Sequence, residues 1–389
     1  MRNSLLAGAA ALALTACNDT VSPTMPGGAS RIGAPSAQLG ADRQNSGTQG
    51  AVFTETNAVA GNAVVAFARA EDGSLTYAGS FPTGGNGIGG TNDPLASQYS
   101  LILSDNAKLL FVVNAGSNTI STFRVDGASL SLVGTTSSRG ELPTSLAIAR
   151  HTLYVLNANS NTVSGFDISE SGALSPNAQA SSPLAGGAIG GAAVRASRDG
   201  KWLVVTEKGS KSIDVFSVSG SGALGAPVRS VSSGVSPFGF DFVNGDQIAV
   251  SEAGSAAASL YDISKDGSLN VESASVSTNG QAAPCWLITT ASGRFAYTAN
   301  AGSGTISGYS IGVQGGLTLI NASGVTGSTG AGTTPLDLDL SRGDKYLYVL
   351  ESSVGRIGGF AVGADGALAP LAGIGGLAAN SGLQGIAVY

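Results

Sequence analysis

Residues 114–123 read NAGSNTISTF, and a near copy, NANSNTVSGF, occupies residues 157–166. Five further stretches of the chain follow the same pattern, the first of them degenerate. Each copy ends on an aromatic residue, and these aromatic residues are 43 to 56 positions apart: Phe67, Phe123, Phe166, Phe216, Tyr261, Tyr309 and Phe360. Self-similarity at this period indicates one supersecondary unit that is repeated seven times.

The last copy shows what one unit builds. Residues 334–341 alternate apolar and polar side chains, residues 346–351 form an apolar run, and residues 357–362 and 367–374 form two more short runs. Polar, glycine-containing turns separate the four segments, as expected for β-hairpins. Four antiparallel strands in each of seven units predict an all-β fold, a seven-bladed β-propeller.

The two ends of the repeat series complement each other. The chain finishes with residues 383–389, which form only a first strand, whereas the visible repeats begin near residue 51 with a second strand. We therefore expect residues 383–389 to lie innermost in the blade whose other strands come from about residues 51–80. This pairing would close the ring without leaving an open sheet edge.

The composition limits the classes of partner. The chain has 389 residues with 58 glycines and 11% charged residues, which favours turns and strands over amphipathic helices. Its net charge is −6 and it contains no run of Lys or Arg, so a surface that follows nucleic-acid phosphates is not expected. We expect a monomer.

The first residues are typical of an exported protein. Arg2 precedes an apolar stretch, residues 5–14, that is too short to span a bilayer as a stable anchor. Residues 14–17, Leu-Thr-Ala-Cys, resemble a bacterial lipobox, which predicts a lipoprotein signal peptide at 1–16 and a lipid on Cys17. Asn18 then implies sorting to the outer membrane. The alternative is an ordinary secretory signal in which the cysteine occurs by chance.

Three segments follow from this interpretation. Residues 1–16 form the signal peptide, residues 17–50 form the lipidated cysteine with a flexible Gly, Ser and Pro tether, and residues 51–389 form the propeller. The protein would be anchored in the cell envelope by its lipid alone. If Cys17 is acylated, no internal disulfide is expected in the mature fold.

The repeats resemble the YVTN type of propeller repeat, most clearly in LYVLNANSNTVSGFDI at 153–168, LFVVNAGSNTISTFRV at 110–125 and RGDKYLYVLE at 342–351. Residues 51–389 as a whole are similar to the seven-bladed lactonase family, which includes proteins like 6-phosphogluconolactonase and carboxymuconate cyclase. The resemblance implies the fold directly. It indicates the chemistry poorly, because one fold carries many activities.

Lactonase-type members of that family use His, Arg and Glu at the funnel mouth, often with a His two residues after the Pro that opens a first strand. The corresponding positions here are Ser145, Gly239, Trp286 and Asp337. The single histidine, His151, falls in a turn at the opposite end, where we expect it to be exposed. Histidine acid–base catalysis and a multi-histidine metal site are therefore not expected, and neither is a cofactor.

Three repeats carry a carboxylate where the others have Asn: Glu207, Glu252 and Glu351. These positions close the second strands at the same rim as the predicted funnel mouth, so a general base or a ligand site there is one hypothesis. The other is that each carboxylate caps the amides of its own hairpin.

The main candidate site lies on the innermost strands. Arg195, Asp241 and Asp339 fall at one level of those strands, and Trp286 and Asp337 lie one layer nearer the predicted entrance. Arg195 would bind an anionic group and Trp286 would stack against a ligand, which suits an acidic or sugar-like molecule. The alternative is a buried ion pair between Arg195 and Asp241 of consecutive blades.

Three functions remain open. The leading hypothesis is an envelope-anchored propeller that binds a small molecule, such as a sugar lactone or an acidic ligand, or an envelope protein at the funnel face. The second is an enzyme, a lactone hydrolase or cycloisomerase that uses Arg195 with an Asp or Glu base, for which Asp241 and Asp339 are the named candidates. The third is a structural or adhesive surface protein.

Overall fold

The structure is a computed structural model that describes residues 49–187, 189–313 and 315–389. The predicted signal peptide, the lipid on Cys17 and nearly all of the tether lie outside the described residues. The first strand begins at Gly50, close to the predicted start of the propeller. Among the described residues, no helix is long and apolar enough to cross a membrane.

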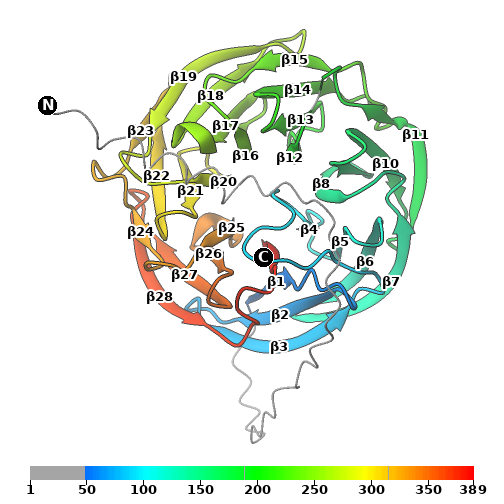
Figure 1. The fold of residues 1–389 in the computed structure, drawn as a ribbon, viewed down its shortest axis with the longest axis horizontal. Helices are drawn as coiled ribbons and strands as arrows, with labels where there is room; N and C mark the ends of the chain where they lie inside the picture. Colours follow the sequence, from blue (N-terminus) through cyan, green and yellow to red (C-terminus); the bar gives the residue numbers. More distant parts are fainter. Residues whose placement is uncertain (1–48, 188, 314) are drawn as a thin grey trace, which may run out of the picture.

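Seven antiparallel sheets are arranged in a ring, with the innermost strand of each near the centre and the outermost strand at the rim (Figure 1). Six of the seven blades take their strands in simple chain order, and four of these lie between residue 101 and residue 277. Their strands are β4 (Leu101–Leu103), β5 (Leu109–Asn114), β6 (Thr119–Asp126), β7 (Ser129–Ser137), β8 (Pro143–Ala149), β9 (Thr152–Asn157), β10 (Thr162–Ile168), β11 (Leu174–Pro183), β12 (Gly191–Ala196), β13 (Trp202–Glu207), β14 (Ser212–Ser217), β15 (Val228–Val231), β16 (Pro237–Asn244), β17 (Gln247–Glu252), β18 (Ala257–Ile263) and β19 (Leu269–Ser277).

The other three blades contain the remaining strands. They are β20 (Pro284–Thr289), β21 (Phe295–Asn300), β22 (Thr305–Ile311), β23 (Leu317–Leu319), β24 (Gly327–Ser328), β25 (Pro335–Leu340), β26 (Tyr346–Glu351), β27 (Arg356–Val362), β28 (Leu368–Ile374), β29 (Gln384–Val388), β1 (Gly50–Glu55), β2 (Ala63–Arg69) and β3 (Leu75–Pro82). Two 3-10 turns, η1 (Ala253–Ser255) and η2 (Arg342–Asp344), are the helical segments of the described residues. In the β20 blade the outer strand is split, because β23 and β24 both pair with β22.

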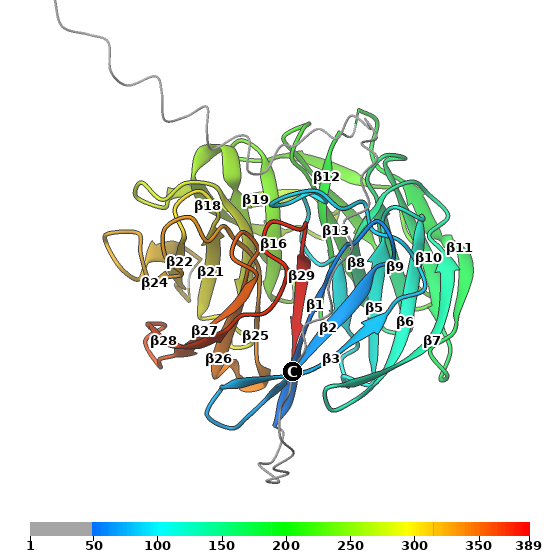
Figure 2. The ribbon, with the colours of Figure 1, turned by 60° about the horizontal axis from the view of Figure 1, so that its bottom comes forward.

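The predicted closure of the ring is confirmed. Strand β29 pairs with β1, and the register places Val388 opposite Val52 and Gln384 opposite Glu55. The blade order is β29-β1-β2-β3, so the last strand of the chain lies innermost in the first blade, beside β1 in Figure 2. The ring is therefore closed by hydrogen bonds between the two ends of the chain.

Alternation along β25 explains how the blades pack and what faces the channel. Leu336, Leu338 and Leu340 are buried between blades, as the apolar positions of the PLDLDL pattern predict. Asp337 and Asp339 project to the other side of the strand, toward the axis. The hydrophobic core is thus a ring of inter-blade layers, and the polar residues of the inner strands remain for the channel.

The two ends of the channel can be defined by the strands. At the upper end the innermost strands begin, for example at Pro143, and at the lower end they finish, for example at Ala149. Gln49 and Tyr389 both lie at the lower end, where Figure 2 marks the C-terminus. His151 is exposed in a turn of the lower end, as predicted.

Candidate functional site

A loop that precedes β4 crosses the channel. Residues 96–100, which we call the plug, form hydrogen bonds with the inner strands of five other blades, and Figure 1 shows this segment entering the ring before β4. Their partners are Thr144 for Ser97, Ala192 and Leu287 for Gln98, and Phe240 and Asp337 for Tyr99. The plug therefore joins strands that are far apart in the sequence.

One glycine permits this path. A Cβ atom at Gly239 would collide with Oε1 of Gln98 and with the carbonyl oxygen of Cys285. Gly239 is one of the positions where the family resemblance led us to look for a histidine. A plug side chain lies there instead, so a histidine at this position would not fit beside Gln98.

The plug covers two of the predicted ligand-binding residues. Trp286 is 1% exposed and its Nε1 donates a hydrogen bond to the carbonyl oxygen of Ser97 (2.8 Å). Asp337 is 2% exposed and accepts a hydrogen bond from the backbone N–H of Tyr99 (3.2 Å). Burial raises the pKa of Asp337 to about 8. Neither residue lines the cavities around Arg195.

Arg195 is both paired and accessible. Its Nε lies 3.3 Å from Oδ1 of Asp241, so the predicted ion pair between consecutive blades is present. Its guanidinium also lies over the ring of Tyr99, 4.4 Å from the ring centroid. Within the described part of the chain, Nη1 and Nη2 have no hydrogen-bond partner, and the side chain is 33% exposed. The structure thus combines the two alternatives: Nε holds Asp241 while the two terminal nitrogens remain available to a ligand.

The two aspartates at this level also connect neighbouring blades. Oδ2 of Asp241 accepts hydrogen bonds from the N–H and Oγ1 of Thr289 in the next inner strand. Oδ2 of Asp339 likewise accepts the N–H of Val388 in the closing strand (2.8 Å). Sequence parity placed these aspartates at one level correctly, but it did not indicate that each would bond the backbone of the following blade.

The carboxyl group of Asp339 has an unusually high pKa. Burial raises its pKa to about 7, although the N–H of Val388, the positive charge of Arg195 and the N–H of Leu340 oppose the rise. Asp339 is only half-buried, and it lines the same cavity as Arg195. A carboxylate that titrates near neutral pH beside a guanidinium is an arrangement suited to hydroxyl recognition or to general-base chemistry.

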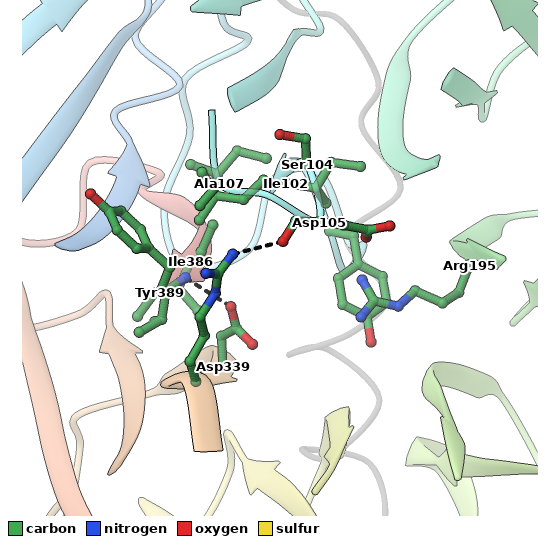
Figure 3. A pocket seen from close by; sticks show the side chains of 14 residues that line it. Ile102, Ser104, Asp105, Ala107, Arg195, Asp339, Ile386 and Tyr389 are labelled. Atoms are coloured by element: carbon green, nitrogen blue, oxygen red, sulfur yellow. Dashed lines mark hydrogen bonds between the residues drawn. The ribbon is translucent and has the colours of Figure 1, made fainter. Parts of the chain in front are cut away.

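This cavity, which we call the axial cavity, has a volume of about 200 Å³ and opens at the lower end. Its lining includes Tyr99, Asp105, Arg195, Asp339 and Arg342. Figure 3 shows Asp105, Arg195 and Asp339 around it, contributed by different blades. Nη2 of Arg342 donates a hydrogen bond to the carbonyl oxygen of Asp105 (2.7 Å), which fixes one wall.

The predicted approach to Arg195 from the upper end is wrong, because the plug lies on that side of it. Arg195 instead faces the lower end, through the axial cavity and a second cavity of about 350 Å³ that is also lined by Asp105, Arg150, Arg198 and Asp241. Sequence analysis missed Tyr99, Asp105, Arg150 and Arg342. Charged residues in the turns that follow the inner strands were the available signal.

The three glutamates lie apart from this cluster, and each has partners in its own blade. Glu207 is paired with Arg229 (2.7 Å), and Glu351 forms two hydrogen bonds with Arg356. Glu252 accepts hydrogen bonds from several hydroxyls of its blade, including Tyr261 (3.0 Å), and from a loop N–H. All three are buried and satisfied. The glutamates are structural, but the predicted capping of hairpin amides is wrong, because arginines and hydroxyls are their main partners.

The expectation of no internal disulfide depends on acylation of Cys17, which lies outside the described residues. Cys285 is fully buried at the start of β20, next to Trp286. Among the described residues, no group of three or more His, Cys, Asp or Glu side chains could hold a metal ion.

Comparisons with known structures agree on the fold. A Bacteroides fragilis protein, provisionally assigned as a 6-phosphogluconolactonase, is 18% identical, with a TM-score of 0.66 over 90% of this chain and 100% of its own. A Lactobacillus plantarum protein is 18% identical, with a TM-score of 0.70 over 87% of this chain and 99% of its own. The periplasmic gluconolactonase of Pseudomonas aeruginosa is 17% identical, with a TM-score of 0.64 over 86% of this chain and 98% of its own.

No curated protein sequence matches the chain significantly. A family model does: the model described as lactonase, 7-bladed beta-propeller, matches residues 55–186 and 153–283. These two matches overlap and together span more than half of the chain, and they cover strands that form several complete blades. The chain therefore belongs to the seven-bladed β-propeller lactonase family.

Proposed function

We propose that the protein binds a small acidic sugar, an aldonic or uronic acid or its lactone, in the axial cavity. One observation carries the proposal: the terminal nitrogens of Arg195 face a cavity that Asp339 also lines. A guanidinium binds a carboxylate through paired hydrogen bonds, and a nearby carboxylate accepts hydrogen bonds from sugar hydroxyls. A ligand that carries a carboxylate and hydroxyls can therefore form hydrogen bonds with both Arg195 and Asp339.

Calorimetric titration tests the binding. The wild-type protein should bind glucuronate and gluconate more tightly than glucose, because glucose offers hydroxyls to Asp339 but no anion to Arg195. Equal affinity for the acidic and the neutral sugars would contradict the proposal.

Lactone hydrolysis is a second candidate function, favoured by the raised pKa of Asp339. In this scheme Asp339 takes a proton from a water molecule that attacks the lactone carbonyl carbon, and a terminal nitrogen of Arg195 stabilises the carbonyl oxygen as negative charge develops on it. The ring C–O bond breaks, the ring oxygen receives a proton, and a free hydroxy acid is formed.

The pH dependence tests this scheme. Asp339 must be ionised to act as a base, and its pKa is about 7, so the enzymatic rate should rise with pH through neutrality and level off above about pH 8. After subtraction of spontaneous ring opening, hydrolysis of gluconolactone should show this rise in the wild type. Asp339→Asn should remove it. A wild-type rate equal to the spontaneous rate at every pH would leave binding as the sole function of the cavity.

We also propose that the propeller is anchored in the cell envelope through a lipid on Cys17, the last residue of the lipobox-like segment. Labelling with a fatty-acid analogue should mark the wild type and spare Cys17→Ser. Equal labelling of the two proteins would contradict the anchor.

A further inference from the structure

Three cavities adjoin at the lower end. The axial cavity and the second cavity share Ile102, Leu103, Asp105 and Arg195, and a third cavity of about 730 Å³ shares Asp105, Ile148 and Arg150 with the second. Asp105 lines all three. Together they form a trough from the axis to the groove between the β4–β7 blade and the β8–β11 blade. A ligand bound in the axial cavity therefore has room to extend outward.

Positive charges recur along this trough. Arg195 lies at the axis, Arg150 lines the second and third cavities, and Lys108 and Arg124 line the outer groove. Within residues 49–187, 189–313 and 315–389, the side-chain nitrogens of Arg150, Lys108 and Arg124 form no hydrogen bond or ion pair. These three side chains are exposed and available to anions spaced along an extended ligand.

Carboxylates alternate with these cations. Asp105 lies at the junction of the cavities, and Asp126 and Glu170 line the outer groove. A purely anionic chain would meet repulsion at these positions, whereas a chain that also carries hydroxyls can donate hydrogen bonds to them. Leu109 and Ile168 add apolar surface to the groove, which suits the C–H faces of sugar rings.

We propose that the trough binds an acidic oligosaccharide, a short chain of uronic acid residues with its end in the axial cavity and its following residues along Arg150 and the outer groove. Each residue of such a chain brings one carboxylate and several hydroxyls, which matches the alternation of cations and carboxylates. The proposal rests on the proposed function, because the axial cavity would hold the terminal acidic sugar.

Calorimetry with galacturonate and its linear dimer and trimer tests the proposal. Affinity should rise about tenfold with each added residue, since each one adds charge-assisted hydrogen bonds. The double substitution Lys108→Gln with Arg124→Gln should reduce the ratio of trimer affinity to monomer affinity by about tenfold. Arg139→Gln, which removes an exposed arginine at the upper end, should leave that ratio unchanged.

Three outcomes would contradict the proposed binding site along the trough. Dimer and trimer that bind no more tightly than the monomer would show that the site ends at the axial cavity, and the proposed function would stand. An oligo-aspartate peptide that binds as tightly as the trimer would show that charge alone is recognised. If neither the monomer nor any oligomer binds, the proposed function fails together with the trough.

Discussion

Removing residues 383–389 should unfold the whole propeller. The deletion removes β29, which is the innermost strand of the first blade and the hydrogen-bond partner of β1. It exposes an unpaired strand edge and uncovers apolar surface that Leu383, Ile386 and Val388 bury. At about 1.5–3 kcal/mol for each large apolar side chain, the loss reaches about 6 kcal/mol, which is comparable to the total stability of many domains.

Thermal unfolding followed by circular dichroism measures this effect. The truncated protein should lack a cooperative transition, and a synthetic peptide of residues 383–389 should restore one, whereas a scrambled peptide should not. The peptide distinguishes loss of strand pairing from a general effect of truncation. A truncated protein that melts at the wild-type temperature would contradict closure by β29.

Arg195→Gln should reduce the affinity for glucuronate by about a hundredfold. Glutamine is neutral and cannot reproduce the paired N–H donors of the guanidinium, which are the groups that face the axial cavity. The same change breaks the 3.3 Å contact with Asp241, but because Arg195 is one-third exposed and Asp241 keeps its hydrogen bonds to Thr289, we expect only a modest loss of stability.

Two further variants separate charge from geometry. Arg195→Lys keeps the positive charge without the planar fork, so it should bind glucuronate with intermediate affinity. Arg139→Gln at the upper end is the matched control and should bind like the wild type. If Arg195→Gln retains wild-type affinity while its melting temperature falls, Arg195 serves the ion pair alone and the ligand site lies elsewhere.

The sequence was most informative where the repeat applies. The PLDLDL stretch of β25 predicted both the buried leucines and the inward-facing aspartates, and the incomplete blades at the two chain ends predicted how the ring closes. The alternation of side chains along equivalent inner strands also predicted that Arg195 and Asp241 lie at the same height along the channel, where they form an ion pair. These features depend on local alternation, which every copy of the repeat shares.

The plug could not be predicted in this way. Residues 96–100 belong to no repeat, and Ala96 and Tyr99 adopt positive φ, which non-glycine residues rarely do without tertiary contacts. Their hydrogen bonds reach strands 47 to 238 residues away along the chain. Because the plug determines which end of the channel leads to Arg195, the direction of ligand approach depends on contacts that a repeat pattern does not contain.

We propose that the lower end of the channel binds an acidic sugar through Arg195. A crystal structure of the protein soaked with glucuronate would show where the sugar lies. We predict the carboxylate within hydrogen-bond distance of Nη1 and Nη2 of Arg195, with a sugar hydroxyl donating to Asp339, in the axial cavity. Glucuronate bound at the upper end, or an empty axial cavity in crystals grown and soaked at saturating ligand, would contradict the claim.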